Sequence, residues 1–368
     1  MNGTNIAEPN AVFNELPRMI ARLLSLLSLA FTLAFAVAGS PAQAAPRCLS
    51  DCTPRIGIVS AFGAEADILV ANTQGRRSFT VNGNRFTTGT LRGNRVVIVL
   101  SGVSMINSTM VTQLMLDHFH VQRLIMSGIS GGVNPAHHVG DVIVPERWAM
   151  PLEVYWNHDG TPPAPCGAPG DVSCLGLKLA EVNGKTVPPF VGAAPVGGLF
   201  MRQNFVMSRE RAPQGEFRFD YEADPAMLEV ARAITPTLAR CGPKAFKPGV
   251  AEPDPKLCVA TQPRVVVGGR GVSGTLFLAN PAYRTYLFEQ LQAETFEMET
   301  AALAHVAHAN GVPYIAFRSL SDLAGAEEFN ADVGALFASG LAETNEAAVT
   351  MAFLEAWKAR TVPRRQKK

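Results

Sequence analysis

The sequence predicts an α/β fold with a mainly central, mixed sheet, because strand-like apolar runs and helix-like segments alternate along most of the chain. "RIGIVSAF" (55–62) is a continuous apolar run that ends in turn residues, which is typical of a buried strand. Segment 104–119 instead places its apolar residues at helical spacing. The alternation of strand, helix and strand recurs to residue 353, and no internal repeat is present.

Turn and cap signals place the other elements. In "FTVNGNRFTTGTLRGNRVVIVLSG" (79–102), Asn-Gly and Arg-Gly-Asn break alternating patterns, as in strands joined by tight turns. Further strands are predicted in "VQRLIMSGISGG" (121–132) and "VGDVIVPERWAM" (139–150). "DPAMLEVARAITPTLARC" (224–241) predicts a helix with Asp224 as its N-cap and a proline in its first position.

Residues 151–220 do not show this alternation of strands and helices. Proline and glycine are frequent there, and the periodicity of the apolar residues is weak. We interpret this segment as a loop-rich insertion, closed by a disulfide between Cys166 and Cys174, and not as a separate domain. The rest of the chain, after an N-terminal segment that is described next, is expected to form one domain.

The N-terminal residues have the layout of a secretory signal peptide. Arg18 and Arg22 precede a long apolar run, and Ala42-Gln43-Ala44 follows as a small-residue cleavage site. The alternative is a transmembrane anchor, for which the run is at the lower limit of length. We therefore expect a periplasmic or secreted protein with no stable membrane anchor after cleavage. The expected organisation is a signal peptide (1–44), a linker (45–54), the domain (55–357) and a solvated basic tail (358–368).

All six cysteines lie after the expected cleavage site, where an exported chain meets an oxidising compartment. Their spacing groups them into local pairs, although six cysteines allow fifteen connectivities. Zinc binding is the alternative, but the sequence has no Cys-x-x-Cys and its histidines lie away from the cysteines. The expected disulfides are Cys48–Cys52, Cys166–Cys174 and Cys241–Cys258.

Composition limits the classes of function. The chain has 368 residues, of which 47% are hydrophobic and 17% charged, with a formal net charge of +1. This is typical of a globular protein. The balanced charge argues against nucleic acid as the main partner, because no basic stripe is present.

Two short motifs suggest functions that their surroundings exclude. "GISGG" (128–132) matches the serine-hydrolase elbow, but another strand and not a helix follows it. That fold also needs a histidine after its acid, and no histidine follows His308, so Asp322 cannot be the acid of such a triad. "GRGVSG" (269–274) matches the dinucleotide fingerprint, but the next helix begins near Asn280, too late to meet a pyrophosphate. A glycine-rich strand end that allows close backbone approach is the better interpretation.

Acids follow three of the predicted strands. Glu65 comes after the first strand, Glu299 after "ETFE" and Asp322 after "YIAFRSLS". Taken singly, each of them suits a helix N-terminus or an N-cap. Together they indicate a ligand site, because open α/β sheets bind ligands at the carboxyl ends of their strands. The other candidate ligand-binding residues at these strand ends are Ser101, Gly102, Ser130, Gly131, Phe277, Leu278, Glu297, Met298 and Ser321.

Four stretches carry a resemblance to a known family: "IGIVSAFGAEADIL", "SGVSMINSTMVTQL", "SGISGGVNPAHHVGDVIVP" and "FEMETAALAHVAHANGVPYIAFRSLSDLAG". The chain resembles the nucleoside phosphorylase superfamily over roughly residues 55–355, apart from 151–220. It is most similar to the methylthioadenosine/S-adenosylhomocysteine nucleosidases and to plant bark and vegetative storage proteins. The resemblance implies a three-layer αβα fold with a mixed central sheet, nucleoside phosphorylase-like, acting without a cofactor or metal.

The resemblance also implies roles for individual residues in cleaving an N-glycosidic bond, which needs an acid for the leaving base and a base for water. Asp322 matches the acid that protonates N7 of a purine, and Glu65 matches the carboxylate that activates water. Glu299 matches the group that holds the ribose hydroxyls. Met298 matches the residue that packs against the sugar, Phe277 the aromatic stacked on the base, and the Leu278 backbone the group that hydrogen-bonds the base edge. Ser101 and Ser321 are expected to support the acids. We expect Arg318 to brace the Asp322 loop through an ion pair.

Hydrolysis is expected rather than phosphorolysis. Phosphate needs a cationic cradle, and the turns "SAFGAEAD" and "SGVSMIN" contain neither arginine nor lysine. The predicted function is an exported purine nucleosidase acting on methylthioadenosine, S-adenosylhomocysteine or adenosine. The alternatives are a purine nucleoside phosphorylase and a non-catalytic nucleoside-binding or storage-type protein. The family also implies a homodimer, with helix 104–119 as either its interface or an ordinary core-facing helix.

Overall fold

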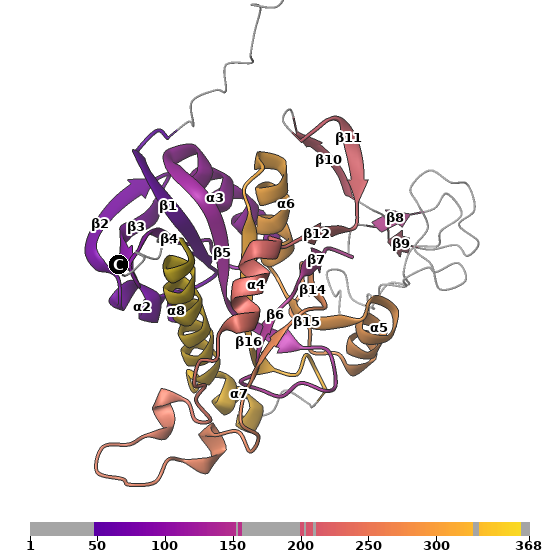
Figure 1. Ribbon diagram of the computed structural model, residues 1–368. Coiled ribbons are helices and arrows are strands. Elements are labelled where there is room, and N and C mark those ends of the chain that lie inside the picture. Colours follow the sequence, from indigo (N-terminus) through magenta and orange to yellow (C-terminus); the bar gives the residue numbers. More distant parts are fainter. Residues whose placement is uncertain are drawn as a thin grey trace, which may run out of the picture. The chain divides into compact units, whose positions relative to one another are not determined.

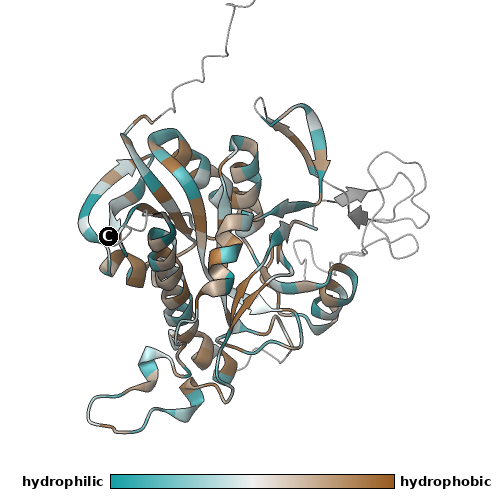
Figure 2. Ribbon diagram, viewed as in Figure 1, coloured by the Kyte–Doolittle hydropathy of each residue, from teal (hydrophilic) through white to brown (hydrophobic). Residues whose placement is uncertain are grey.

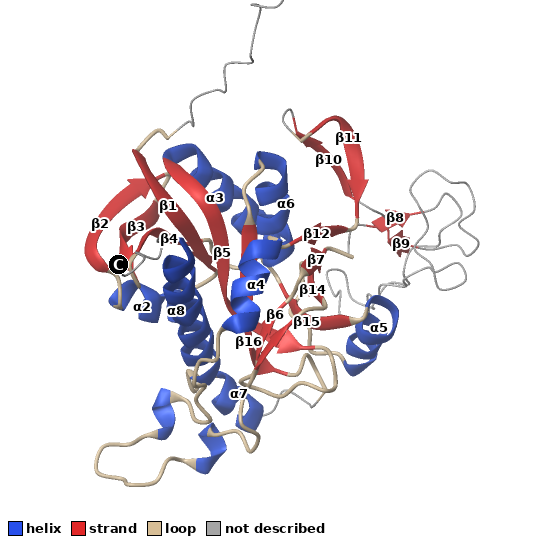
Figure 3. Ribbon diagram, in the orientation of Figure 1, coloured by secondary structure: helices blue, strands red, loops and turns tan. Residues whose placement is uncertain are grey.

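The computed structural model describes residues 48–151, 154–156, 199–201, 204–208, 211–326 and 331–361. All of them belong to the unit Arg47–Lys368, which contains a large sheet with helices on both faces (Figures 1 and 3). The strands are β1 (Asp51–Ser60), β2 (Gln74–Val81), β3 (Asn84–Leu91), β4 (Asn94–Leu100), β5 (Phe119–Gly132), β6 (Val142–Val144), β7 (Arg147–Ala149), β8 (Val154–Trp156), β9 (Leu199–Met201), β10 (Asn204–Ser208), β11 (Ala212–Arg218), β12 (Asp220–Glu222), β13 (Val265–Val267), β14 (Arg270–Ser273), β15 (Ala293–Glu297) and β16 (Tyr314–Asp322). The helices are α2 (Gly63–Ala71), α3 (Met105–His118), α4 (Pro225–Ala233), α5 (Pro281–Leu291), α6 (Thr300–Asn310), α7 (Ala331–Phe337) and α8 (Leu341–Thr361), with short 3₁₀ turns at Pro243–Ala245 and Pro255–Leu257.

The main sheet has twelve strands and is mixed. Along its path the order is β12-β7-β14-β15-β5-β1-β4-β3-β2, while β16 and β6 join beside β5 and β13 pairs with β6. The long strand β5 is the centre of this sheet, since it runs parallel to β1 and β16 and antiparallel to β15. The carboxyl ends of β1, β5 and β16 therefore point to the same edge.

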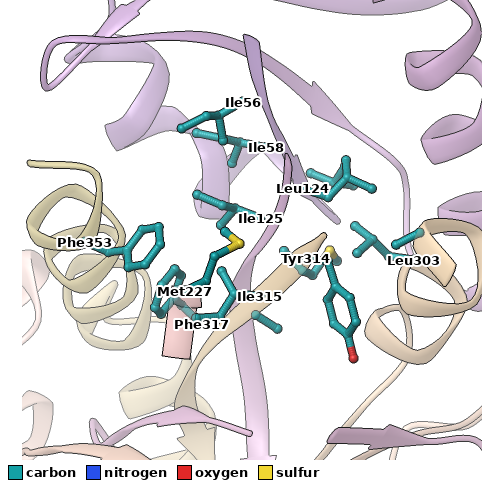
Figure 4. Close-up of a cluster of buried hydrophobic side chains, with 14 of the residues drawn as sticks. Ile56, Ile58, Leu124, Ile125, Met227, Leu303, Tyr314, Ile315, Phe317 and Phe353 are labelled. Atoms are coloured by element: carbon teal, nitrogen blue, oxygen red, sulfur yellow. The ribbon is translucent and has the colours of Figure 1, made fainter. Parts of the chain in front are cut away.

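Helices cover both faces of the sheet, so the predicted three-layer arrangement with a mixed central sheet is confirmed. Helices α2, α4 and α8 pack on one face, and α3 and α6 on the other. In Figure 4, Phe317 of β16 points toward Phe353 of α8, whereas Leu124 of β5 and Tyr314 lie toward Leu303 of α6. Burial on both faces explains why the central strands read as continuous apolar runs. Figure 2 shows the contrast with β2 at the sheet edge, which is largely hydrophilic.

Two predicted helix starts are confirmed, and one predicted helix end is wrong. The Asp224 carboxylate accepts a hydrogen bond from the Met227 N–H at 2.9 Å and caps α4. The Asn280 side chain caps α5 in the same way. Helix α4 ends at Ala233, well before the end predicted from the sequence. The physical reason is Pro236, since the residue before a proline is driven out of the helical region.

Neither "GISGG" nor "GRGVSG" has the structure of the motif that it matches, as predicted from the residues around it. "GISGG" lies inside β5, with no strand-to-helix turn at Ser130. "GRGVSG" overlaps β14, which is not followed by a helix until Pro281. A Cβ added at Gly271 would lie 2.6 Å from ring atoms of Trp148, so the glycine is there to let a buried indole lie against the strand.

The domain limits differ from the expected ones at both ends. Strand β1 begins at Asp51, inside the expected linker, and its first residues pair with the start of β5. Helix α8 continues to Thr361, into the expected tail. The expected signal peptide lies outside the described residues. None of the helices in the described part of the chain is long and apolar enough to cross a membrane.

The described parts of segment 151–220 contain strands, so the loop-rich interpretation is wrong for them. β8 pairs with β9 in an antiparallel pair, and β10 with β11 in an antiparallel hairpin. The Phe205 and Phe217 rings pack against each other across the β10–β11 hairpin, with centroids 4.9 Å apart. Such cross-strand aromatic pairs stabilise strands whose sequence pattern is weak. Cys166 and Cys174 lie outside the described residues.

Two of the expected disulfides are present, Cys48–Cys52 and Cys241–Cys258. The second closes a 17-residue separation that contains both 3₁₀ turns. In the chain-entropy model a loop of this length gains about 3 kcal/mol from the cross-link. The segment therefore depends on a covalent bond as well as on packing.

Replacing both Cys241 and Cys258 by serine is expected to lower the free energy of unfolding by about 3 kcal/mol, because the unfolded chain regains the entropy of an open loop. Urea denaturation followed by circular dichroism would measure it. The matched control replaces Cys48 and Cys52, whose separation of four residues gives an expected loss of only about 2 kcal/mol. Equal stability of the Cys241/Cys258 double variant and wild type would contradict the structural role of this bond.

Candidate active site

A pocket of about 210 Å³ lies at the carboxyl-terminal edge of the sheet. It is built from the segments that follow β1, β4 and β14, from the ends of β5, β15 and β16, and from the end of α7. The predicted acids Glu65, Glu299 and Asp322 all line it. The described lining residues are Ala61, Phe62, Glu65, Val103, Ile129, Ser130, Gly131, Leu276, Phe277, Leu278, Phe296, Glu297, Met298, Glu299, Ser321, Asp322 and Phe337.

Glu65 is held at the first turn of α2 by backbone N–H groups from two strand ends. Its Oε2 accepts from Ala61 N at 2.6 Å and from Phe62 N at 3.3 Å. Its Oε1 accepts from Ile129 N at 2.8 Å. Burial raises the pKa of Glu65, while Arg318 and these three N–H groups oppose the rise. The carboxylate is thus fixed in position and more basic than an exposed glutamate.

Arg318 is fully buried on β16 and is the cation of this cluster. Its guanidinium lies 3.6 Å from Glu65 and 3.5 Å from Glu299, and it forms a closer ion pair with Glu297. Burial alone would lower its pKa, but the acids, Glu297 first, raise it. The expected ion pair with the Asp322 loop is therefore wrong. Four residues of extended strand separate Arg318 from Asp322 by roughly 13 Å along β16, and the acids that meet Arg318 come from other elements.

Glu297 and Glu299 lie two residues apart but have different surroundings. The carboxylate of Glu297 accepts from Ser273 Oγ, from Thr300 N at 2.9 Å and from Thr300 Oγ1 at 2.8 Å, besides its ion pair with Arg318. The carboxylate oxygens of Glu297 are therefore already engaged by hydrogen-bond donors of the protein. Glu299 accepts from Ser104 N at 2.8 Å, and burial together with Glu297 raises its pKa to about 7. Glu299 thus keeps acceptor capacity for a ligand in the pocket.

Asp322 stands apart from the arginine cluster. Its Oδ2 accepts from Ser321 Oγ at 2.9 Å and its Oδ1 from Ala324 N at 2.8 Å. Burial raises the pKa of Asp322, and those two donors only partly offset it. The group is thus suited to carry a proton, as a general acid must. Ser321 also donates to Ser130 O at 3.2 Å, which ties this loop to β5.

The rest of the pocket wall is apolar. Of the predicted contacts, Phe277 is 57% exposed and Leu278 is buried, and both line the pocket with Met298. Ser101 and Gly102 were predicted to contact ligand, but the lining of the pocket begins only at the next residue, Val103. Ser101 Oγ donates to its neighbour's carbonyl at 2.8 Å. The lining also includes residues that were not predicted from the sequence, namely Ala61, Phe62, Val103, Ile129, Leu276, Phe296 and Phe337.

The sequence contains a local signal for some of these residues and none for Phe337. Phe62 and Val103 belong to the strand-end turns "SAFGAEAD" and "SGVSMIN". Phe337 comes from α7, where no local pattern indicates proximity to the strand ends. Gly128 is a further requirement, since a Cβ there would overlap both Glu65 Oε1 and Arg318 Nη1. Only glycine lets β5 lie so close to this ion pair.

The arrangement offers a buried base, Glu65, a buried acid, Asp322, and an acceptor, Glu299, around one small cavity. Titratable groups held at perturbed pKa values in a pocket are typical of acid–base chemistry. Among the described residues, no arginine or lysine lines the cavity, and the buried Arg318 is already paired with three acids. The pocket therefore favours an uncharged ligand over an anion.

Comparisons with known proteins agree with this geometry. The model of a family described as the phosphorylase superfamily matches residues 55–355. A 5'-methylthioadenosine/S-adenosylhomocysteine nucleosidase of Bacillus cereus is 26% identical over 277 residues, which cover 74% of this chain and 87% of the relative. Among solved structures, the S. pneumoniae enzyme of that name, with a transition-state inhibitor, has a TM-score of 0.53 at 22% identity and covers 83% of this chain and 100% of its own. Futalosine hydrolase of Helicobacter pylori has a TM-score of 0.52 at 19% identity, with 85% and 98% covered. The predicted nucleoside phosphorylase-like fold is confirmed, and the predicted enzyme class, N-glycosidic hydrolase, is the class of these relatives.

Proposed function

This chain belongs to the phosphorylase superfamily, and from that premise we propose that it is a purine nucleosidase. Its substrate is a nucleoside such as methylthioadenosine, S-adenosylhomocysteine or adenosine, whose N-glycosidic bond it hydrolyses. The observation that carries the proposal is the convergence of Glu65, Glu299 and Asp322 on one cavity that no described arginine or lysine lines.

The proposed reaction uses these three acids in turn. Protonated Asp322 donates its proton to N7 of the base, which makes the purine a better leaving group as the sugar becomes oxocarbenium-like. Glu65, fixed by the N–H groups of Ala61 and Ile129, takes a proton from the attacking water. Glu299 accepts hydrogen bonds from the ribose hydroxyls. The products are the free base and the free sugar.

Water is favoured over phosphate as the nucleophile. Phosphate binding relies on arginine, lysine or clustered backbone N–H groups. Here the N–H groups at the end of β1 are already engaged by Glu65. Arg318 has no exposed surface and is held by three carboxylates. An anion in this cavity would also meet the charge of Glu65 and Glu299.

Two other functions use the same pocket differently. A phosphorylase would release base only when phosphate is present. A storage-type protein would bind nucleoside without turnover, for which a buried acid and a buried base at raised pKa values have no use. The retention of both groups favours catalysis.

The test is to follow free base and sugar by chromatography, with adenosine, inosine, methylthioadenosine and S-adenosylhomocysteine, in the presence and absence of phosphate. Release without phosphate is expected, and Glu65→Gln is expected to slow it by about 10²- to 10⁴-fold through loss of the general base. The control Glu222→Gln changes an exposed acid outside the pocket and should leave the rate unchanged. Strict dependence on phosphate would overturn the role of Glu65, and binding without release would indicate the storage class.

Export and dimerisation are further proposals. The disulfides Cys48–Cys52 and Cys241–Cys258 are consistent with an oxidising compartment, and N-terminal sequencing of secreted protein would test cleavage after Ala44. For the dimer, Val103 just before α3 is 48% exposed, and Ile106 and Met110 in the first turns of α3 are 76% and 55% exposed. Such a group of exposed apolar side chains is typical of an interface. Sedimentation of Ile106→Glu should then give a monomer, and an unchanged mass would refute this interface.

A further inference from the structure

A second cavity adjoins the candidate active site at Asp322. Its volume is about 320 Å³, and Ser321 and Asp322 line both cavities. Its other walls come from the loop after β5, the segment that follows the Cys241–Cys258 disulfide, the Asp322 loop and α7. The described lining residues are His138, Val139, Cys258, Val259, Ala260, Thr261, Ala279, Ser321, Asp322, Leu323, Gly325, Val333 and Leu336.

The second cavity lies at the end of the site where the purine base would bind. Glu65 and Glu299, the groups that face water and ribose in the proposed reaction, line only the first cavity. Along the loop after β14, Leu278 lines the first cavity and the next residue, Ala279, lines the second. The second cavity thus begins where the base meets Asp322, away from the sugar.

The chemistry of this cavity favours an apolar group. Most of its lining is aliphatic, including Val139, Val259 and Leu336. Asp322 and His138 are its only described ionisable residues, and no arginine or lysine lines it. A charged or strongly polar group would lose hydration here and would find few polar partners among these walls.

The walls are held in place by specific contacts. Arg240 donates to the carbonyls of Val259 at 3.2 Å and Ala260 at 3.0 Å, and its own carbonyl accepts from Val259 N at 2.7 Å. A Cβ at Gly325 would overlap the backbone of Ala279, so the Asp322 loop and the loop after β14 lie in direct backbone contact. The cavity is therefore a defined part of the fold and is preorganised for a ligand group.

We propose that this cavity receives an apolar substituent on position 6 of the purine, so that N6-alkyl and N6-aryl adenosines are substrates. The inference rests on the proposed function. With Asp322 at N7, the exocyclic group on C6, which is joined to N7 through C5, projects from the same edge of the base, on the side opposite to the sugar-bearing N9. Such a substituent would pass Asp322 and enter the aliphatic cavity, where its burial contributes to binding.

The experiment compares kcat/KM for adenosine and N6-benzyladenosine in wild type and in Val259→Trp, which fills the cavity with an indole. Wild type should cleave both nucleosides with kcat/KM values within about tenfold of each other. Val259→Trp should lower kcat/KM for N6-benzyladenosine by about tenfold or more and leave that for adenosine unchanged. The matched control, Val250→Trp, changes an exposed valine inside the loop closed by Cys241–Cys258. Val250 lines neither cavity.

Two outcomes would overturn the inference. One is cleavage of adenosine with no cleavage of N6-benzyladenosine, and the other is equal cleavage of the latter by wild type and Val259→Trp. If no nucleoside is cleaved, the proposed function fails, and calorimetric titration with 6-benzylaminopurine and adenine decides this inference separately. Tighter binding of 6-benzylaminopurine that Val259→Trp abolishes would uphold it, whereas equal or weaker binding would refute it.

Discussion

Asp322→Asn is expected to lower the rate of base release by about 10²- to 10⁴-fold, because asparagine cannot donate the proton that the leaving purine needs. The fold should be retained. Asparagine has the same shape, and its side-chain oxygen can still accept from the Ala324 N–H that now bonds to Asp322 at 2.8 Å. Since burial favours the neutral form of Asp322, a neutral replacement carries no electrostatic penalty. Substrate depletion by chromatography would measure the loss of rate.

The pH dependence provides a second test of the same role. Asp322 acts in its protonated form, so the wild-type rate should fall as pH rises through its raised pKa. The residual rate of Asp322→Asn should lack this fall. The control Asp332→Asn replaces an exposed acid on α7 and should keep both the rate and its pH dependence. Near-normal turnover by Asp322→Asn would remove Asp322 from the mechanism.

Arg318→Met is expected to destabilise the protein by about 3–5 kcal/mol at neutral pH, because it leaves buried acids without their cation. Glu65, Glu297 and Glu299 surround the guanidinium, and methionine cannot replace its charge or its hydrogen bonds. Catalysis should fall as well, since Arg318 opposes the rise in pKa of both Glu65 and Glu299. Urea denaturation would give the change in the free energy of unfolding.

The loss of stability should depend on pH with a definite sign. Without Arg318 the raised pKa values of Glu65 and Glu299 rise further in the folded state, so at neutral pH the folded variant binds more protons than the folded wild type. Its stability relative to wild type should therefore be closest at acid pH, where both proteins carry these protons, and should fall as pH rises through the wild-type pKa of Glu299, about 7. The control Arg360→Met removes a surface ion pair with Glu229, worth at most about 1 kcal/mol. Wild-type stability of Arg318→Met at pH 8 would contradict this account.

Local chemistry in the sequence determined the fold class and the positions of the main acids. The continuous apolar runs of β1 and β5 follow from burial on both sheet faces, and the N-caps Asp224 and Asn280 satisfy N–H groups within their own helices. The three acids Glu65, Glu299 and Asp322 could be placed together because each follows a strand, and strand ends gather at one edge of a sheet. These features depend on residues close in sequence.

Tertiary structure alone decided which groups contact each other. Arg318 pairs with three glutamates and not with the nearby Asp322, because the neighbours of a strand side chain come from whichever elements pack on its face. Phe337 reaches the pocket from α7, and Val259 lines the cavity beyond Asp322 because a disulfide and Arg240 hold its segment there. These contacts join residues far apart in sequence, and neither periodicity nor turn chemistry carries information about them. The sequence therefore determined the acids of the site, whereas packing decided their charge partners and the space around them.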